Sequence, residues 1–259
     1  TWHLFLESQR LAYADRELYA ADSDFVSVPV RGLVDPGYLA SRSALISADS
    51  TMATVTPGTP PGVQQALADG DEPEEQGTTH FAVVDDAGTM VSYTSTVEGP
   101  FGSGLMVGGF FLNNELTDFS RAPQVGGRLV ANRVEPGKRP RSSMAPSLVY
   151  DPSGNPYMVV GAAGGGTIPV QTARSIIGAI DFGLDAEDAL GLPFVMAFGD
   201  RVLLEEGTWL EAQADAFRAL GHGDIMIREA PLKAGAILRG ANGWVGARDP
   251  RLEGQLETP

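Results

Sequence analysis

The stretch Gln76-Gly77-Thr78-Thr79-His80-Phe81-Ala82-Val83-Val84-Asp85 marks the point where a turn-rich, acidic segment changes into a strand-like pattern. Its alternation predicts a β-strand from Thr79 to Asp85, and a second alternating run extends from Met90 to Val97. The connection between them, Asp85-Asp86-Ala87-Gly88, contains a glycine, which accepts the positive φ that hairpin turns often require. The two runs therefore predict a β-hairpin.

The second run carries hydroxyl side chains on one face, at Ser92, Thr94 and Thr96. Successive side chains of a strand point to opposite faces, so these hydroxyls share a side. Two interpretations stay open from the pattern alone. The face is either the polar outer side of an edge strand or part of a site that uses hydroxyl groups.

The segment that leads into the hairpin, residues 47–77, differs in composition from its surroundings. Residues 56–62 are turn and polyproline material, and residues 69–75 are almost all acidic. This composition predicts an exposed connector. A plain linker and a loop that is processed by cleavage are both compatible with it.

The remaining periodic segments indicate a mixed α+β protein with no internal repeat. The patterns predict helices at residues 2–19, 38–46, 171–182, 185–190 and 209–220, and strands at residues 146–150, 157–160, 225–228, 236–239 and 243–247. The chain opens inside a helical pattern, which leads us to expect an upstream part.

Composition excludes several classes of function. The formal net charge of −15 opposes binding to nucleic acid, because phosphate recognition needs a concentrated basic face. The chain has no cysteine, which excludes thiol nucleophiles, disulfides and cysteine-bound zinc. No run approaches the ~20 apolar residues of a membrane span, so no membrane-spanning helix is expected.

The three histidines, His3, His80 and His222, are scattered along the chain, and no metal site is expected from them. His222 stands between two glycines and is predicted to be a loop residue. His80 lies on the same side of its strand as Thr78. It is either a structural histidine, the interpretation we favour, or a base.

A hydroxyl nucleophile that lacks a histidine base can use the amine of an N-terminal threonine instead. The unperturbed pKa of that amine, about 7.7 to 8.0, leaves a usable neutral fraction near pH 7. For Thr78 this requires cleavage of the bond to Gly77. Glycine has no Cβ, so the threonine hydroxyl can approach its carbonyl carbon.

A glycine-rich turn, residues 161–166, follows a predicted strand and precedes a predicted helix. Backbone N–H groups in such a turn can bind an anion. The spacing does not match GxGxxG, and no Gly-Lys-Ser/Thr follows, so a nucleotide site is a weak interpretation.

Several motifs, in one order, resemble those of γ-glutamyltransferases. They lie at residues 77–85, 94–96, 101–104, 112–120, 136–146 and 161–165, and the similarity extends to residues 12–16, 24–26, 181–184 and 249–251. The resemblance implies an N-terminal-nucleophile hydrolase with a four-layer αββα sandwich, here lacking much of the large subunit. It implies that residues 1–77 are the C-terminal part of the large subunit with the processing linker, and residues 78–259 the small, catalytic subunit.

The same resemblance implies a self-cleaving enzyme in which Thr78 attacks the γ-glutamyl amide through its own freed amine. Thr96 matches the threonine that supports the nucleophile. Gly164 and Gly165 match the pair whose N–H groups form an oxyanion hole, which agrees with the anion-binding turn inferred above. Cleavage is expected between Gly77 and Thr78.

The resemblance also implies a pocket for the amino-acid end of the substrate. Glu115 and Asp118 match residues that hold the α-ammonium, and Ser142 and Ser143 match residues that bind the α-carboxylate. At Glu98 the family usually has asparagine, so the extra negative charge is expected to strengthen ammonium binding or to alter preference.

Two further departures from the family are visible. The loop at residues 121–135 is shorter than in better-known members and has no tyrosine. A reduced lid would favour hydrolysis over transfer. Most of the large subunit, including an arginine expected to pair with the substrate carboxylate, is not in this sequence.

We therefore expect a γ-glutamyl amide hydrolase/transferase for glutathione-like substrates, with water or an amino acid or peptide as acceptor and no cofactor. Its expected partner is the rest of its own large subunit, and the family implies a periplasmic or extracellular location. One alternative is a related acylase of glutaryl-type amides. The other is an inactive or unprocessed fragment with a structural or binding role.

Overall fold

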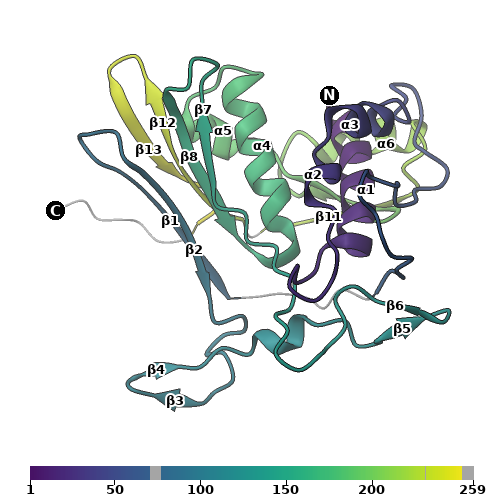
Figure 1. Cartoon of the computed structure of the whole chain (residues 1–259). Helices are drawn as coiled ribbons and strands as arrows, with labels where there is room; N and C mark the ends of the chain where they lie inside the picture. Colours follow the sequence, from purple (N-terminus) through teal and green to yellow (C-terminus); the bar gives the residue numbers. More distant parts are fainter. Residues whose placement is uncertain (71–76, 231, 253–259) are drawn as a thin grey trace. The chain divides into compact units, whose positions relative to one another are not determined.

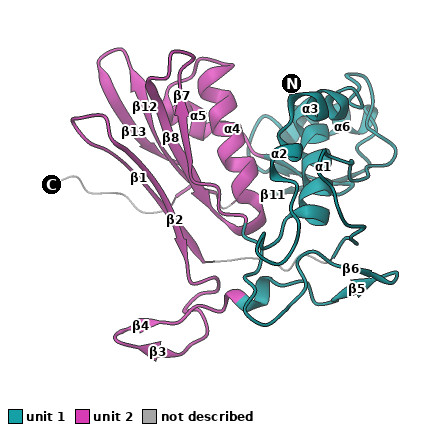
Figure 2. Ribbon diagram, viewed as in Figure 1, with its two compact units in different colours: residues 1–73, 116–142, 195–229 teal, residues 74–115, 143–194, 230–259 magenta. Residues whose placement is uncertain are grey.

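The computed structural model describes residues 1–70, 77–230 and 232–252 (Figure 1). They form two compact units, each built from three separate stretches of the chain (Figure 2). Unit 1 comprises Thr1–Pro73, Leu116–Ser142 and Val195–Glu229, and unit 2 comprises Glu74–Glu115, Ser143–Phe194 and Ala230–Pro259. Each unit is described by itself below.

The two larger antiparallel sheets of unit 2 pack against each other. One sheet is the hairpin of β1 (Thr78–Val84) and β2 (Met90–Thr96). The other has the order β13-β12-β8-β7, with β7 at Ser147–Tyr150, β8 at Pro156–Ala163, β12 at Lys233–Gly240 and β13 at Gly243–Arg248. Strand β1 contacts β8 and β12, and β2 contacts β7 and β8.

Two helices cover the other face of the four-stranded sheet. Helix α4 (Ile168–Ile180) lies on β8, and α5 (Ala186–Gly191) lies on β12 and β13. Met158 and Val160 of β8 are fully buried beneath Ile168 and Leu190 of the helices. The described residues of unit 2 thus form three layers, sheet, sheet and helices, and the predicted α+β class is confirmed.

The hydroxyl face of β2 turns inward, toward the four-stranded sheet. Ser92 Oγ donates to the carbonyl oxygen of Val160 in β8 at 3.0 Å. The opposite face carries Phe81 and Tyr93, which stack at 5.0 Å and are each about half exposed. The interpretation of the hydroxyls as a polar outer face is therefore wrong, because these side chains find their hydrogen-bond partners between the sheets.

A buried arginine joins the last part of unit 2 to its helices. Arg174 of α4 pairs with Asp249 at 3.3 Å and donates to the carbonyl oxygen of Leu190, the latter at 2.8 Å. Arg251 donates to the carbonyl oxygen of the same leucine at 3.1 Å. These bonds satisfy the free carbonyl at the end of α5, which explains why an Asp-Pro-Arg motif stands there.

Unit 1 is built on α1 (Trp2–Tyr19) and a three-stranded sheet in the order β11-β10-β9. The strands are β9 (Val195–Phe198), β10 (Arg201–Glu205) and β11 (Asp224–Arg228). Leu6 of α1 is fully buried against Val195 and Leu204. The smaller helices are α2 (Val30–Leu33), α3 (Pro36–Ser43) and α6 (Ala214–Ala219).

Short elements complete the two units. Unit 2 has the paired strands β3 (Met106–Val107) and β4 (Phe110–Phe111) and the 3-10 turn η2 (Gly165–Thr167). Unit 1 has β5 (Gln124–Val125) paired with β6 (Arg128–Leu129), and η3 (Glu211–Gln213). The 3-10 turn η1 (Glu115–Asp118) lies where the chain passes from unit 2 to unit 1.

Two predictions about elements need correction, and two strands were missed. The predicted helix at residues 209–220 begins at Ala214, after the 3-10 turn η3. Strands β9 and β10 were not predicted. The connector is not wholly exposed, since Leu67 and Ala68 are buried and Leu67 packs with Tyr19 and Val26; its acidic residues 71–76 lie outside the described residues.

Candidate active site

The two threonines at the open end of the hairpin face each other. Thr78 begins β1, and the strand register places it directly opposite Thr96 at the end of β2. The Thr78 hydroxyl donates to Thr96 Oγ1 at 3.2 Å, and both side chains are half-buried. The hairpin therefore brings the predicted nucleophile and the predicted supporting hydroxyl into direct contact.

Gly77, on the other side of the proposed cleavage bond, is held in a conformation that suits glycine. Its φ is +93°, in the left-handed region. A Cβ at this position would lie 2.2 Å from the backbone oxygen of Glu98, far inside van der Waals contact. Both the backbone angle and the available space thus require glycine immediately before Thr78.

The turn after β2 is strained and tightly held. Glu98 is a non-glycine residue at φ +72° and is only 6% exposed. Its backbone N–H donates to Thr96 Oγ1 at 2.8 Å. The Asn114 side chain donates to Glu98 Oε2 at 2.7 Å and accepts from the Gly99 N–H at 2.9 Å. Strain of this kind persists where surrounding contacts enforce it.

The glycine turn after β8 is held by a buried glutamine. Gly164 and Gly165 have φ values of +125° and +57°. Gln171 is fully buried, and its Nε2 donates to the Ala163 carbonyl oxygen at 2.9 Å and to Thr167 Oγ1 at 2.7 Å. The Thr167 hydroxyl donates in turn to the Gly164 carbonyl oxygen at 2.7 Å. This network fixes the backbone that was predicted to bind an anion.

Two contacts show how the hairpin lies along β8. Ala82 of β1 is paired with Ser92 of β2, and the Ser92 hydroxyl donates a hydrogen bond to the Val160 carbonyl oxygen of β8. Two residues nearer the start of β1, the ring of His80 lies against Gly161 of β8. Moving from Ala82 toward Thr78 along β1 therefore advances along β8 toward its C-terminal end. The start of β1 and the glycine turn lie at the same end of the packed sheets (Figure 1).

His80 does not contact the predicted nucleophile through a hydrogen bond. Its Nδ1 lies 2.9 Å from Thr94 Oγ1, while the Thr78 hydroxyl donates to Thr96. Burial lowers the pKa of His80, so the ring is neutral near pH 7. This arrangement agrees with the structural interpretation of His80, in which it is not the base.

The predicted substrate-binding residues fall in both units. Glu115 and Ser143 belong to unit 2 with Thr78, and Asp118 and Ser142 belong to unit 1. Glu115 is half-buried, Asp118 and Ser143 are buried, and Ser142 is exposed. Their roles in binding stay predictions.

Within unit 1, a buried asparagine connects the two segments that carry Asp118 and Ser142. Asn132 Nδ2 donates to the Asp118 carbonyl oxygen at 2.7 Å, and Asn132 Oδ1 accepts from the Arg141 N–H at 2.9 Å. Asn132 is fully buried, so both bonds are made away from water. Sequence reasoning missed this residue, because the predicted loop gave no sign of burial.

The basic run at residues 138–141 is largely used inside unit 1. Arg139 binds both carboxylate oxygens of Asp22, at 2.9 and 3.1 Å, and holds the pKa of that carboxyl well below its usual range. Lys138 Nζ is buried and donates to the Ala131 carbonyl oxygen at 2.7 Å. The basic run thus has a structural use.

His3 and His222 are far apart in the sequence, but they lie side by side in unit 1. His3 Nε2 lies 3.0 Å from the Ser47 carbonyl oxygen, which can only accept, so this nitrogen carries the proton. His3 Nδ1 then accepts from His222 Nε2 at 2.8 Å. Burial, with the neighbouring His3, lowers the pKa of His222 to about 4.

Glu7 lies beside this pair, and the three residues are the candidate ligands for an ion among the described residues. Tetrahedral zinc would hold two imidazole nitrogens about 3.3 Å apart, farther than the hydrogen-bonded pair. The Glu7 carboxylate already accepts from Arg10 Nη1 at 2.9 Å and from the Met52 N–H at 2.7 Å. The two histidines are thus too close together for zinc, and Glu7 already has its own hydrogen-bond partners.

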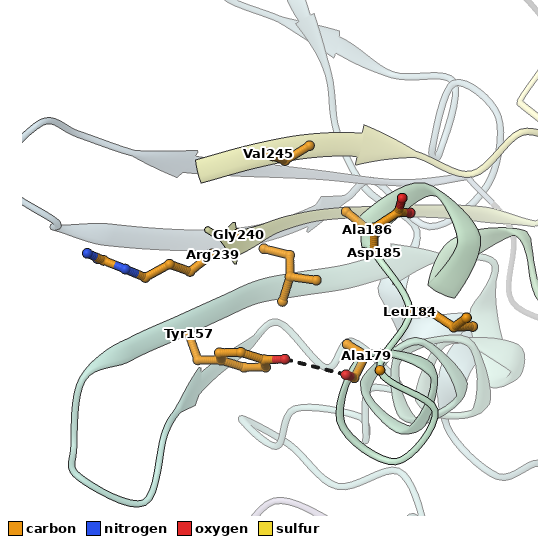
Figure 3. Close-up of a pocket in the computed structure, with 10 residues that line it drawn as sticks. Tyr157, Ala179, Leu184, Asp185, Ala186, Arg239, Gly240 and Val245 are labelled. Carbon is orange, nitrogen blue, oxygen red and sulfur yellow. Dashed lines mark hydrogen bonds between the residues drawn. The ribbon is translucent and has the colours of Figure 1, made fainter. Parts of the chain in front are cut away.

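A cavity of about 260 Å³ lies elsewhere in unit 2, between the start of α5 and the β12–β13 hairpin (Figure 3). The Tyr157 hydroxyl points toward the Ala179 carbonyl oxygen, 3.4 Å away, and Asp185 and Arg239 also line the cavity. None of the predicted site residues lines it.

In the part of the chain that the structure describes, the helices are too short or too polar to cross a lipid bilayer.

Comparison with known proteins supports the motif resemblance over the whole chain. The family model described as gamma-glutamyltranspeptidase matches residues 1–258. The glutathione hydrolase proenzyme of Bacillus subtilis strain 168 is 40% identical over 200 residues, which cover 74% of this chain and 33% of that protein. The glutathione hydrolase proenzyme of Escherichia coli K12 is 33% identical, covering 96% of this chain and 43% of that protein.

Solved structures give the same result. Gamma-glutamyltranspeptidase of Helicobacter pylori, in its T380A mutant, has 32% identity and a TM-score of 0.57, and the match covers 67% of this chain and all of that one. Cephalosporin acylase of Bacillus halodurans has 27% identity and a TM-score of 0.81, covering 98% of this chain and 44% of that one. The chain spans between a third and a half of the length of the two curated relatives named above. Because the family model matches nearly the whole chain and the sequence identity to curated members reaches 40%, this chain belongs to the gamma-glutamyltranspeptidase family.

Proposed function

We propose that this chain is the nucleophile-bearing part of a self-cleaving γ-glutamyl amide hydrolase/transferase that acts on glutathione-like substrates. One observation carries the proposal: Thr78 follows a left-handed glycine directly and donates its hydroxyl hydrogen to Thr96 at 3.2 Å. The names of the two glutathione hydrolase relatives support the substrate class. Residues 1–77 are proposed as the end of the large subunit and 78–259 as the small subunit.

Self-cleavage would begin with attack of the Thr78 hydroxyl oxygen on the carbonyl carbon of Gly77. The C–N bond between Gly77 and Thr78 breaks as the C–O ester forms, and the hydroxyl proton passes to the departing amine. Water then hydrolyses the ester, which leaves a carboxylate on Gly77 and a free amine and hydroxyl on Thr78. The hydrogen bond to Thr96 would hold the attacking Thr78 oxygen on the inner face of the hairpin during these steps.

Turnover would use the same hydroxyl on a γ-glutamyl amide. The free amine of Thr78 takes the hydroxyl proton as the oxygen attacks, and it later gives a proton to the leaving amine. The N–H groups of Gly164 and Gly165 would stabilise the negative oxygen of the tetrahedral intermediate. Water, or the amine of an amino acid or peptide, then attacks the acyl-enzyme and releases Thr78.

Recognition would depend on opposite charges at the amino-acid end of the substrate. We assign the α-ammonium to Glu98, Glu115 and Asp118, and the α-carboxylate to Ser142 and Ser143. Carboxylates form short, charge-assisted hydrogen bonds with an ammonium group. The short loop at residues 121–135 would leave the site open to water, which favours hydrolysis, and a periplasmic or extracellular location is proposed from the family.

Trapping of the acyl-enzyme tests this proposal. The mature protein is mixed with a γ-glutamyl anilide, quenched in acid and measured by mass spectrometry. The piece that begins at Thr78 is expected to gain the mass of one γ-glutamyl group, and Thr78→Ala to gain none. Turnover of the anilide with the label on another residue would refute the assignment of the nucleophile.

A related acylase activity is the second candidate, because one relative, the ACY 1 acylase proenzyme of Pseudomonas strain SE83, is 33% identical over 85% of this chain. A glutaryl anilide, which lacks the α-amine, separates the two. If the acidic residues bind an ammonium, the glutaryl compound should be turned over much more slowly than the γ-glutamyl compound. Equal or faster turnover of the glutaryl compound would favour the acylase.

A further inference from the structure

The inner face of the β1–β2 hairpin carries a second polar pair next to the threonines. The register places His80 opposite Thr94, one step along the same face from Thr78 and Thr96. His80 Nδ1 and Thr94 Oγ1 are 2.9 Å apart. The nucleophile and the imidazole are thus held on one strand at a fixed separation of two residues.

The imidazole occupies a hollow in the neighbouring sheet that two glycines create. Gly161 of β8 and Gly235 of β12 are directly opposite each other in the strand register. A Cβ on Gly161 would lie 2.4 Å from His80 Cε1 and 2.6 Å from Nδ1, and a Cβ on Gly235 would lie 3.8 Å from Cδ2. The ring therefore fills the space that a side chain on Gly161 would take.

Strand β8 continues from this contact to the glycine turn. Gly161 is three residues before Gly164, and the intervening Ala162 and Ala163 are buried and paired with β12. The antiparallel pairing of residues 161–163 with residues 233–235 holds the backbone of β8 from the His80 contact to the start of the turn. Contact between His80 and Gly161 thus relates the position of the nucleophile to that of the turn.

The chemistry of the ring agrees with a spacing role. His80 Nε2 is buried and has no hydrogen-bond partner among the described residues. Burial also keeps the ring neutral, as noted above. The neutral ring therefore fills space between the two sheets and makes one hydrogen bond, to Thr94.

We propose that His80 is a positioning residue: its imidazole, seated in the Gly161–Gly235 hollow, sets the distance between the Thr78 hydroxyl and the Gly164–Gly165 turn. The inference rests on the proposed function, in which these groups attack and stabilise the same carbonyl. It predicts that His80 and Gly161 act as a complementary pair. Either change alone shifts the nucleophile, and the two changes together restore the fit.

The test compares wild type, His80→Ala, Gly161→Ala and the double variant. Each is measured for the rate of self-cleavage and for kcat and KM with a γ-glutamyl anilide. A displacement of about 1 Å at a reacting group costs up to ~100-fold in rate. Each single variant is therefore expected to lose roughly 10- to 100-fold in cleavage rate and kcat. KM should stay within about twofold, because substrate-binding groups are untouched.

The double variant is the decisive measurement. Removing the ring makes room for the methyl group on Gly161, so it should recover most of the kcat that Gly161→Ala loses. If His80→Ala gives no folded protein, Gly161→Ala and the double variant still decide. A double variant no faster than Gly161→Ala would overturn the proposal, as would His80→Ala with wild-type kcat and cleavage.

Measurements on the wild-type protein distinguish failure of this inference from failure of the proposed function. Cleavage at the 77–78 bond and turnover by wild type support the proposed function, whatever the variants do. Wild type that neither cleaves nor turns over substrate would refute the proposed function and this inference together. A fall in melting temperature with unchanged kcat in His80→Ala would show a purely structural histidine, which also overturns the inference.

Discussion

Replacement of Gly77 by alanine should slow self-cleavage at the 77–78 bond. The residue has φ +93°, and a left-handed conformation costs an L-residue about 1–2 kcal/mol. At the scissile bond itself, that cost reduces the ratio of this local conformation to its alternatives about 5- to 30-fold. The new Cβ would also lie 2.2 Å from the backbone oxygen of Glu98, and backbone cannot rotate away as a side chain can. We expect cleavage to slow by at least about tenfold.

Gly88→Ala is the matched control. Gly88 has a similar φ of +84°, but nothing lies within 4 Å of a Cβ built there. It stands in the turn between β1 and β2, at the other end of the hairpin from Thr78. This variant should lose a similar 1–2 kcal/mol of stability and still cleave at close to the wild-type rate.

The assay follows newly synthesised precursor on denaturing gels and by intact mass, with the melting temperature of each variant recorded. If Gly77→Ala cleaves as fast as wild type, neither the φ of Gly77 nor its closeness to Glu98 matters for cleavage. If Gly77→Ala and Gly88→Ala slow cleavage equally, the cause is a general weakening of the hairpin and not the contact with Glu98.

Three further predictions concern the supports of the site. Thr96→Val should lower the cleavage rate and kcat by about 10²-fold or more, because it removes the hydroxyl that Thr78 contacts. Thr96→Ser should keep most of both rates, and Thr79→Val, on the outer face of β1, should change them little. Equal kcat values for all three variants with the anilide would contradict a specific role of the Thr96 hydroxyl. Gln171→Leu leaves the Ala163 carbonyl and the Lys233 N–H without their partner, so urea unfolding should show a loss of roughly 2–5 kcal/mol, and an unchanged unfolding free energy would contradict this. The pKa of His222 is lowered to about 4 from 6.5, so the neutral ring contributes fully to stability above about pH 6.5, and this contribution is lost as the pH falls toward 4. The melting temperature of wild type should therefore fall between pH 6.5 and pH 4. An equal fall in His222→Gln would contradict this.

The hairpin and the two longer helices could be predicted because local patterns determine them. Alternation and Gly88 predicted β1 and β2, and the 3.6-residue period predicted α1 and α4. Which face of the hairpin is buried could not be predicted. Hydroxyls usually mark the wet face, but here they bond β8 and each other between two sheets.

The sequence predicts which groups react, and their roles stay predictions, but it does not show the residues that hold those groups in place. Thr78, Thr96 and the glycine turn lie in short motifs that can be read directly from the chain. Asn114 and Gln171 act on residues up to 62 positions away, such as Lys233. The hollow for His80 needs Gly161 and Gly235 to become neighbours, and no local pattern shows that pairing.

The units also differ from the order of the chain. Residues 116–142 and 195–229 pack with residues 1–70, although the predicted boundary between subunits is at the 77–78 bond. Compactness follows from contacts in space, while a processing boundary follows from chemistry at one bond. The boundary at 77–78 therefore stays a prediction.

The state of the bond between Gly77 and Thr78 decides whether Thr78 has the free amine that the proposed chemistry requires. Intact mass under denaturing conditions, with sequencing of each N-terminus, should show two pieces, one of which begins at Thr78. Thr78→Ala should remain one piece. A single uncleaved species that still turned over the γ-glutamyl anilide would contradict the account, because the free amine that it requires as a base would not exist.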